Sequence, residues 1–563
     1  MNVSKLSEPW RSHYAHPVAW DQQFAPLSLP AMFASATRDH GSAPLVEFYG
    51  RTYNYAALYA EARAFAAGLQ ARGIGKGDRV GLYLPNVPTY VPAYFGAMMA
   101  GATVVNFSPL YTVNELEAQV ADSGTRLLVT VDLAKLLPTA LTVLRGSALE
   151  TLVVARFASL LPRWKGLAFR LLSRKDLTAV PLAADVVTWD QLLAPGEPAP
   201  LEIDPLHDLA LLQYTGGTTG TPKGAMLTHQ NLTANARQID AVDPHAGDRD
   251  VILGALPLFH VFANSAVLNR TVQGGGCIAM VPRFDIGQVL ATIARTRPTS
   301  FPGVPTMFQA LLDDPRLKAT DLSSLRVCIA GGAPLPPPLK QRWQAMTGVR
   351  LVEGYGLTET SGVVSTNPYE GDDRAGSIGQ PLPATRLRLL DREDPTRDAP
   401  KGEPGELAVT GPQIMQGYWQ RPEAAATAFA EIDGELWLRT GDVAVLEEDG
   451  YVRIVDRLKD MIAVGGFKVF PSQVEAVLLQ HPAVKEALVI GMPDNYLGEM
   501  PRAFVTLLDG EQADGAELKV WLNDRVGKHE RVDAVVVRDS MPKTMIGKLD
   551  RRALKEEVLT GAG

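Results

Sequence analysis

Residues 214–224, with the sequence YTGGTTGTPKG, constrain the fold more than any other stretch. Glycine lets the backbone approach an anion closely, so successive N–H groups can converge on phosphate oxygens. Threonine hydroxyls add donors, and the lysine adds a positive charge. The apolar segment LALLQ precedes the stretch and AMLTHQNL follows it, which predicts a phosphate-binding loop between a strand and a helix. Gly224 stands where a Walker loop needs Ser or Thr after the lysine, which argues against a Walker-type kinase or GTPase.

The size and charge of the chain narrow the function classes further. A chain of 563 residues is too long for one ordinary core, and its 46% hydrophobic and 21% charged residues are typical of a soluble globular enzyme. The net charge of -8 and the pI near 5.7 argue against general nucleic-acid binding. We therefore expect small-molecule partners and no nucleic acid.

Neither the cysteines nor the apolar stretches indicate secretion or a membrane span. Cys277 and Cys328 lie in apolar surroundings, which predicts core thiols rather than a disulfide or a zinc site. The N-terminus has no apolar run typical of a secretory signal, so we expect a cytoplasmic protein. Residues 80–114 carry no charge, but their prolines and asparagines favour a strand, a buried helix and another strand over a membrane span.

The order of apolar patterns predicts the domain organisation. Helical patterns alternate with short strand-like runs, as in AEARAFAAGLQARG followed by GDRVGLYLPN. This alternation predicts an α/β fold with a large N-terminal domain of parallel-rich sheets and helices. After VDRLKD the pattern restarts, which predicts a small C-terminal α+β domain. We expect an N-terminal extension at 1–29, the large domain at 30–456 and the small one at 457–563.

The segment 156–175, RFASLLPRWKGLAFRLLSRK, contains basic residues but no acid. Its apolar residues fall on one face at helical spacing. Two interpretations stand with equal weight: a helix that lies on an anionic membrane surface, and a helix docked on the domain with a solvated basic side. The apolar set is Trp164, Leu167, Ala168, Leu171 and Leu172.

Several single residues indicate nucleotide chemistry when they are taken together with the glycine-rich stretch. Tyr355 lies between glycines in EGYGLTET, where a flat ring can stack on a purine, and Glu359 can hold Mg²⁺ bridging phosphates. Asp442, in an RTGD turn, can accept hydrogen bonds from ribose hydroxyls. His260 lies in the apolar run ALPLFHVFA, which indicates either a core histidine or the wall of an apolar cavity. Lys548 lies in an exposed loop that alone carries little information.

Five motifs in this order resemble those of the adenylate-forming superfamily, which includes acyl-CoA synthetases, firefly-type luciferases and the adenylation domains of peptide synthetases. They are YTGGTTGTPKG, GYGLTET, RTGD, VDRLKDMIAVGGFKVFP and PKTMIGK, and the likeness spans about residues 30–555. The first motif, continued by KGAMLTH, and the segment DMIAVGGFKVFP look most similar to bacterial fatty acyl-CoA synthetases.

The resemblance implies a two-step reaction. A carboxylate attacks the α-phosphate of MgATP to give acyl-AMP and pyrophosphate, and the thiol of coenzyme A then displaces AMP. The resemblance implies catalytic roles for Lys548, Glu359, Thr215 and His260, with Glu359 as the Mg²⁺ ligand. ATP binding is implied for Thr215, Gly216, Gly217, Thr218, Thr219, Gly220, Lys223, Gly332, Ala333, Pro334, Glu353, Gly354, Tyr355, Gly356, Thr358, Asp442, Arg457 and Lys548.

The resemblance also implies that the small domain rotates about residues 456–459 between the two steps. This motion withdraws Lys548 and brings Gly465, Gly466 and Phe467 to the coenzyme A channel. The acyl pocket is expected along His260, Phe301, Gly303, Gly354 and Gly356. Homodimerisation is expected by analogy only.

Several functional alternatives remain at this point. Ala463 stands where luciferases have a lysine, which disfavours light-emitting chemistry. A fatty acyl-CoA synthetase is the first choice, and an aryl- or dicarboxylate-CoA ligase is the rival within the enzyme class. A ligase that loads a carrier protein is less favoured because no carrier domain is attached. A catalytically silent binding protein would have lost Glu359 or Lys548, and both are present.

Overall fold

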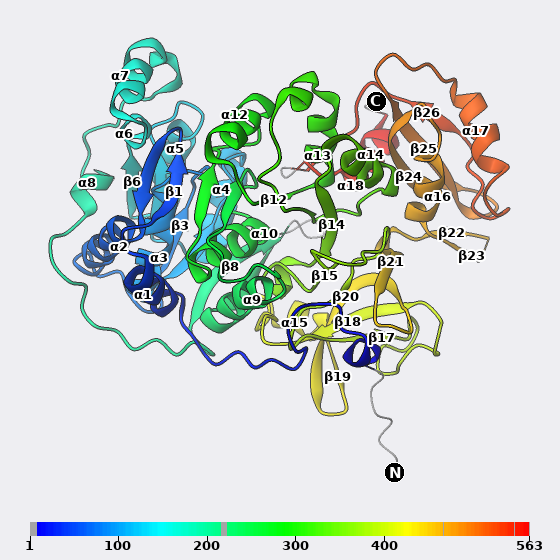
Figure 1. Cartoon of the computed structure of the whole chain (residues 1–563), viewed down its shortest axis with the longest axis horizontal. Helices are drawn as coiled ribbons and strands as arrows, with labels where there is room; N and C mark the ends of the chain where they lie inside the picture. The colour runs from blue at the N-terminus through cyan, green and yellow to red at the C-terminus, as the bar shows by residue number, and fades with distance from the viewer. Residues whose placement is uncertain (1–7, 216–221, 466, 545–546, 562–563) are drawn as a thin grey trace.

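The computed structural model describes residues 8–215, 222–465, 467–544 and 547–561. Within these residues the strands form four sheets, and the C-terminal elements gather at one end of the molecule (Figure 1). The two larger sheets are mostly parallel and are covered by helices, while the later sheets are mostly antiparallel. This arrangement confirms the expected α/β class with a smaller C-terminal α+β domain.

The first sheet is parallel except at its last strand. Its central strands LLVTV and TLVVA are almost entirely buried, as expected for a sheet covered on both faces. In spatial order it contains β7 (Val186–Thr188), β6 (Thr151–Ala155), β5 (Leu127–Val131), β3 (Arg79–Leu82), β4 (Thr103–Asn106), β8 (Leu209–Thr215) and β9 (Lys223–Thr228).

The strand β9 corrects one expectation from the sequence. KGAMLT forms a strand antiparallel to β8, so residues 216–221 connect two strands of a hairpin rather than a strand and a helix. The helix α9 (His229–Ala241) begins only after Thr228, whose hydroxyl accepts from the Asn231 N–H at 3.1 Å. The AMLT part of AMLTHQNL thus pairs in the sheet, and only HQNL begins the helix.

The second sheet brings the carboxyl ends of its parallel strands to the centre of the molecule. Ligands in such sheets usually bind at this edge. In spatial order it contains β16 (Gln380–Pro381), β15 (Ser365–Thr366), β14 (Arg350–Tyr355), β13 (Val327–Ala330), β12 (Ser300–Gly303), β10 (Val251–Gly254), β11 (Cys277–Met280), β1 (Pro44–Phe48) and β2 (Arg51–Asn54).

Helices cover these two sheets and connect their strands. The charge-free stretch 80–114 folds as β3, the buried helix α3 and β4, as predicted. In the described part of the chain, no helix is both long and apolar enough to cross a membrane. The further helices are α1 (Leu29–His40), α2 (Tyr55–Gln70), α3 (Tyr90–Met99), α4 (Val113–Ser123), α5 (Leu137–Gly146), α6 (Phe157–Leu160), α7 (Arg163–Leu172), α8 (Trp189–Leu192), α10 (Val261–Ala263), the π-helix η3 (Asn264–Asn269), α11 (Arg270–Gln273), α12 (Ile286–Thr296), α13 (Pro305–Asp313) and α14 (Pro337–Thr347).

The third sheet holds the segment that precedes α1. Trp10 and Trp20 are buried against Leu387, Leu407 and Val452. The sheet contains β17 (Arg386–Leu390), β18 (Gly405–Thr410), β20 (Glu435–Leu446) and β19 (Phe429–Ile432), with β21 (Val452–Arg457) paired to β20 and α15 (Pro422–Ala428) beside it. Short helical turns elsewhere are η1 (Pro9–Ser12), η2 (Arg174–Asp176), η4 (Pro315–Ala319), η5 (Thr358–Thr360) and η6 (Leu458–Asp460).

The fourth sheet has its own apolar core, which includes Val474, Leu478, Val489 and Val505. It begins at Ile462, five residues after β21 of the third sheet ends. Its elements are β23 (Phe467–Val469), β22 (Ile462–Val464), β25 (Gly498–Leu507), β24 (Val484–Asp494), β26 (Val535–Val537), α16 (Pro471–Leu478), α17 (Gly515–Asn523) and α18 (Arg551–Thr560).

Candidate active site

A cleft of about 2320 Å³ lies at the carboxyl ends of β12, β13 and β14, between the second sheet, the third sheet and the C-terminal domain. The motifs singled out in the sequence converge on it, although they are far apart along the chain. Both cysteines are buried and free, as predicted. The predicted site residues that line the cleft are Thr215, Lys223, His260, Gly332, Ala333, Pro334, Glu353, Gly354, Tyr355, Gly356, Thr358, Glu359, Asp442, Arg457 and Lys548.

Asp442 is buried inside β20, in the strand rather than in a turn as the RTGD motif suggested. Its Oδ2 accepts a hydrogen bond from the Tyr355 hydroxyl at 2.5 Å, and Oδ1 lies 3.0 Å from Nε of Arg457. Oδ1 accepts no hydrogen bond from the described residues. A buried carboxylate oxygen with spare accepting capacity suits a ribose hydroxyl. Burial and the charge of Asp442 raise the pKa of Tyr355 well above its usual value, so its hydroxyl remains a donor.

Glu359 lines the cleft from η5, together with Lys223 and Tyr418. Its Oε1 accepts a hydrogen bond from the Tyr418 hydroxyl at 2.7 Å. The ammonium of Lys223 lies 5.3 Å from the centre of the Tyr418 ring. One carboxylate on the wall of this cleft fits Mg²⁺, which proteins commonly hold through one or two carboxylates plus substrate phosphates. The described residues contain no group of three His, Cys, Asp or Glu side chains that could hold a metal without such phosphates.

Lys548 reaches into the cleft from the C-terminal domain. A Cβ placed on Gly332 would lie 2.9 Å from Cε of Lys548 and 3.3 Å from its Nζ, so the side chain passes directly over this glycine. The adjacent backbone oxygen of Gly547 accepts from the Thr306 hydroxyl at 2.9 Å, which ties the loop to α13. Burial and the charge of Arg457 lower the pKa of Lys548 to about 8, although Asp442 opposes this shift.

Glu353 shapes the loop that follows β13. Its Oε1 accepts from the N–H of Leu335 at 3.0 Å, directly after Ala333 and Pro334. Burial raises the pKa of Glu353 to about 8, while this backbone hydrogen bond and Lys340 oppose the rise. The contact explains how a carboxyl in this motif can position the nucleotide loop without itself carrying charge.

Apolar side chains line one part of the cleft, which we call its apolar branch. Phe259 and Phe262 flank His260 in its wall, as the sequence indicated. Burial, together with the charge of Lys548, lowers the pKa of His260 to about 3, so the ring is neutral. Phe301 was predicted in this pocket, but the structure places it fully buried against Phe308, because its strand turns this side chain toward the helices.

Of the residues expected at the coenzyme A channel, the described Gly465 and Phe467 do not line the cleft. Gly465 and Phe467 lie in and beside the hairpin of β22 and β23, and the Phe467 ring is 61% exposed and stacked on His529. Gly466 lies outside the described residues, as do Gly216, Gly217, Thr218, Thr219 and Gly220. This arrangement places Lys548, and not the hairpin, at the cleft.

Sequence reasoning missed Tyr418 and Thr306, which contact Glu359 and the Lys548 loop. Tyr418 lies in QGYWQ, where the adjacent Trp419 donates its backbone N–H to the Gly224 oxygen at 2.8 Å. The glycine and the paired aromatics of this segment were the available signal. Thr306 lies in the helix α13 with no distinguishing pattern around it.

Comparison with known proteins agrees with this geometry. The sequence model of the AMP-binding enzyme family matches residues 33–419, and that of the AMP-binding enzyme C-terminal domain matches residues 473–548. The chain is 38% identical over 556 residues to a long-chain-fatty-acid–CoA ligase of Bacillus subtilis, with 98% of each chain covered. It is 39% identical over 541 residues to a long-chain-fatty-acid–CoA ligase of Escherichia coli O6:H1, with 94% of each covered.

A solved structure shares the fold. The ATP-bound crystal structure of MatB from Rhodopseudomonas palustris matches with a TM-score of 0.81 at 30% identity, covering 94% of this chain and 99% of that one. Together these matches confirm the resemblance to adenylate-forming enzymes that the five motifs indicated, and the likeness to bacterial fatty acyl-CoA synthetases in particular.

Proposed function

The chain belongs to the AMP-binding enzyme family, and we propose that it is an ATP-dependent ligase that activates a medium- or long-chain fatty acid. The acid becomes acyl-AMP, its acyl group passes to coenzyme A, and AMP and pyrophosphate are released. The observation that carries this proposal is one cleft that joins Lys548, Glu359 and Asp442 to an apolar branch. The full-length similarity to long-chain-fatty-acid–CoA ligases supports it.

In the first step, the residues of the large domain hold ATP while Lys548 meets the reacting centre. Thr215 and Lys223 would hold the β- and γ-phosphates, and Asp442 would accept from the ribose. Glu359, oriented by Tyr418, would hold Mg²⁺, which when bound neutralises phosphate charge as the pyrophosphate leaves. The ammonium of Lys548 stabilises the negative charge that develops between the carboxylate and the α-phosphate.

In the second step, the C-terminal domain would rotate about residues 456–459, which span the end of β21 in the third sheet and the start of η6, ahead of the first strand of the fourth sheet. We place the boundary between the domain at 30–456 and the domain at 457–563 there. The rotation would withdraw Lys548 and bring Gly465, Gly466 and Phe467 to the cleft. In the present arrangement Phe467 lies outside the cleft, exposed and stacked on His529.

The decisive experiment measures ATP- and CoA-dependent AMP release with a panel of aliphatic, aryl and dicarboxylic acids. We expect aliphatic acids of medium or long chain length to give the highest kcat/KM. A clear preference for aryl or dicarboxylic acids would support the alternative ligase instead. Nucleotide binding without AMP release for any acid would support the silent binding protein.

The helix α7 supports a peripheral contact with the membrane, at the cytoplasmic face where the enzyme would meet its substrate. The helix docks through Phe169, which packs on the core, and through the buried Gly166. Its opposite face points outward, at the end of the view far from the C-terminal domain (Figure 1). Trp164 is 70% exposed and Leu172 is 84% exposed. The outward apolar residues are Trp164, Leu167, Leu171 and Leu172.

The positive charges around this outward face favour its binding to an anionic lipid surface. The segment 156–175 has no acid, and an amphipathic helix with apolar and basic residues on its outer side binds anionic membranes. The docked position of the helix is consistent with both interpretations of the sequence, because docking leaves the apolar residues exposed. Its basic residues are Arg156, Arg163, Lys165, Arg170, Arg174 and Lys175.

Vesicle sedimentation tests this contact. The wild type should bind phosphatidylglycerol-containing vesicles, and Trp164→Ser with Leu172→Ser should weaken binding at least about ten-fold. Leu436→Ser, at a leucine that is 60% exposed on β20, is the matched control. Unchanged binding by the folded double variant would refute the contact.

Homodimerisation stays a prediction by analogy, which light scattering of the wild type can test.

A further inference from the structure

A charged side chain, that of Arg270, lies at the far end of the apolar branch of the cleft. A buried cluster that includes Ile239, Val242, Ala266 and Val363 packs with Phe262 along this branch. Phe262 stands at its nucleotide end, because a Cβ on Gly331 would lie 2.9 Å from its ring. These side chains provide the apolar wall that an acyl chain requires.

Arg270 stands at the other end of the same wall. Phe262, Ala266 and Arg270 follow each other at intervals of four residues through α10, η3 and α11, so they lie on one face of a continuous helical run. Tyr369 also lines the cleft, and it lies close enough to Arg270 for each group to influence the pKa of the other. An extended chain that passes Phe262 and Ala266 therefore meets Arg270.

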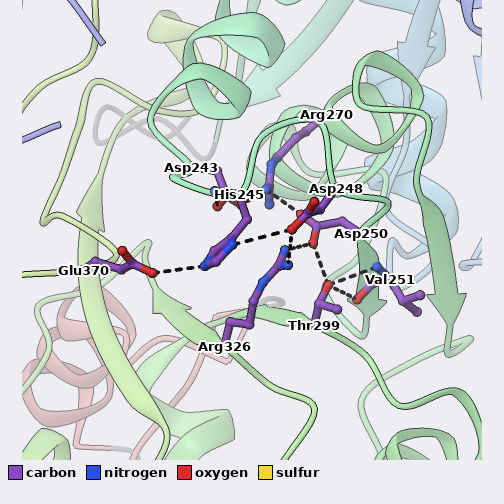
Figure 2. Close-up of polar contacts among 9 residues, drawn as sticks. All are labelled: Asp243, His245, Asp248, Asp250, Val251, Arg270, Thr299, Arg326 and Glu370. Atoms are coloured by element: carbon purple, nitrogen blue, oxygen red, sulfur yellow. Dashed lines mark hydrogen bonds and ion pairs between the residues drawn. The ribbon is translucent and has the colours of Figure 1, made fainter. Parts of the chain in front are cut away.

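The guanidinium of Arg270 is only partly used by its protein partners. Arg270 is 3% exposed, and its Nη2 donates to Asp243 and, at 2.8 Å, to Asp250 (Figure 2). Its Nε is buried and has no hydrogen-bond partner among the described residues. Buried donors without partners are rare in native proteins and call for an explanation. The Arg270 side chain also lines the cleft, so a group bound there lies beside its guanidinium.

The surrounding carboxylates restrict what that group can be. Asp243 and Asp250 both form ion pairs with Arg270. Asp240 lies close enough to contribute to the raised pKa of the Arg270 guanidinium. Burial raises the pKa of Asp240 to about 6, and Asp243 and Asp250 contribute to this rise. A second anion, such as the far carboxylate of a dicarboxylic acid, would be repelled by these groups. An uncharged oxygen can accept a hydrogen bond without this repulsion.

We propose that Arg270 and Tyr369 form a polar end wall of the acyl pocket, which recognises an uncharged hydrogen-bond acceptor at the far end of the substrate. The preferred substrate class is then an ω-hydroxy fatty acid of the length that reaches this wall. A plain methyl end at the wall would accept no hydrogen bond from the guanidinium or from the Tyr369 hydroxyl. This inference rests on the proposed function and narrows its substrate.

The neighbours of the wall allow a variant with balanced charge. In Arg270→Met with Asp243→Asn, one positive and one negative charge are removed together. Asp250 keeps its contacts with Arg326 and with the Thr299 hydroxyl, at 2.7 Å for the latter (Figure 2). The exposed pair Arg297 and Asp321 accepts the same two substitutions as a matched control.

The experiment compares kcat/KM for AMP release between plain acids and ω-hydroxy acids of equal length. At the longest plain acid before kcat/KM falls, the wild type should favour the ω-hydroxy acid by about ten-fold, the scale of one hydrogen bond. Folded Arg270→Met/Asp243→Asn should lose this preference and accept longer plain acids, and Tyr369→Phe should reduce it. The Arg297→Met/Asp321→Asn control should behave as the wild type.

The outcomes separate this inference from the proposed function. Active plain acids with equal kcat/KM for their ω-hydroxy partners at every length would overturn the end wall alone. This comparison needs only the wild type, so it decides even when the double variant does not fold. A preference that persists unchanged in the folded double variant would also overturn it. Absence of AMP release with every acid would overturn both proposals.

Discussion

Replacing Lys548 by alanine should separate the two reactions of the enzyme. The lysine side chain passes over Gly332 in the loop after β13, which is compatible with the role proposed for its ammonium in acyl-AMP formation. The proposed domain rotation removes it before coenzyme A reacts. We therefore expect Lys548→Ala to block acyl-AMP formation and to leave thioester formation from supplied acyl-AMP within a few-fold of wild type.

The expected loss of acyl-AMP formation in Lys548→Ala can be estimated in order of magnitude. Burial and Arg457 lower the pKa of Lys548 from 10.5 to about 8. At 1.36 kcal/mol per pH unit, keeping this lysine charged in the empty cleft costs about 3 kcal/mol, which the arriving phosphates offset. A preorganised charge that is lost from a transition state lowers the rate by about 10²–10³-fold. We expect a loss of at least this size for acyl-AMP formation.

The same pKa sets the sign of the pH dependence. The charged lysine is the active form, and it loses its proton as the pH rises through about 8. The kcat/KM for acyl-AMP formation should therefore fall about ten-fold per pH unit above this value. An ordinary lysine would hold its charge to about pH 10. Lys548→Ala should be slow and should lack this alkaline limb.

Pyrophosphate release in a single turnover measures the first step, and thioester formation from added acyl-AMP measures the second. Lys543→Ala is the matched control, because Lys543 lies in the same loop and pairs with Glu486 at 2.6 Å. It should retain both steps and the alkaline limb. Equal losses in the two steps for Lys548→Ala, in a folded protein, would refute the role derived from the structure.

Further predictions concern the remaining parts of the site. Gly466→Leu should slow thioester formation and spare acyl-AMP formation in the same two assays, and an unaffected second step would place the channel elsewhere. Glu359→Gln should raise the Mg²⁺ concentration for half-maximal acyl-AMP formation more than about ten-fold, and an unchanged requirement would contradict its role. Since burial lowers the pKa of His260 to about 3, no acid limb near pH 6.5 should depend on this residue, as the pH profile of His260→Gln can show. Gly356→Ala should lower the free energy of unfolding by about 1–3 kcal/mol in chemical denaturation, because its Cβ would lie 2.0 Å from the Gly362 oxygen, and no change would count against this packing.

Local chemistry made much of the fold and the nucleotide site predictable. The apolar runs LLVTV and TLVVA form almost entirely buried parallel strands, and the prolines within 80–114 divide a charge-free stretch into two strands and a buried helix. The prediction of a helix directly after the glycine-rich stretch was wrong, because local preferences for helix and for strand compete in this segment. KGAMLT joined β8 as a strand, because pairing with Leu212 and its neighbours outweighed the helical preference of AMLTHQNL.

By itself, the sequence determined the fold class, the family and the set of reactive groups, because these depend on residue types at short spacings. Only the tertiary structure decided how these groups act on one another. Tyr355 bonds to Asp442 across 87 positions, and Tyr418 bonds to Glu359 across 59. Arg270 meets Asp243 only because α11 and α9 pack together. Contacts at such separations follow from the packing of whole elements, which no local pattern in the chain records.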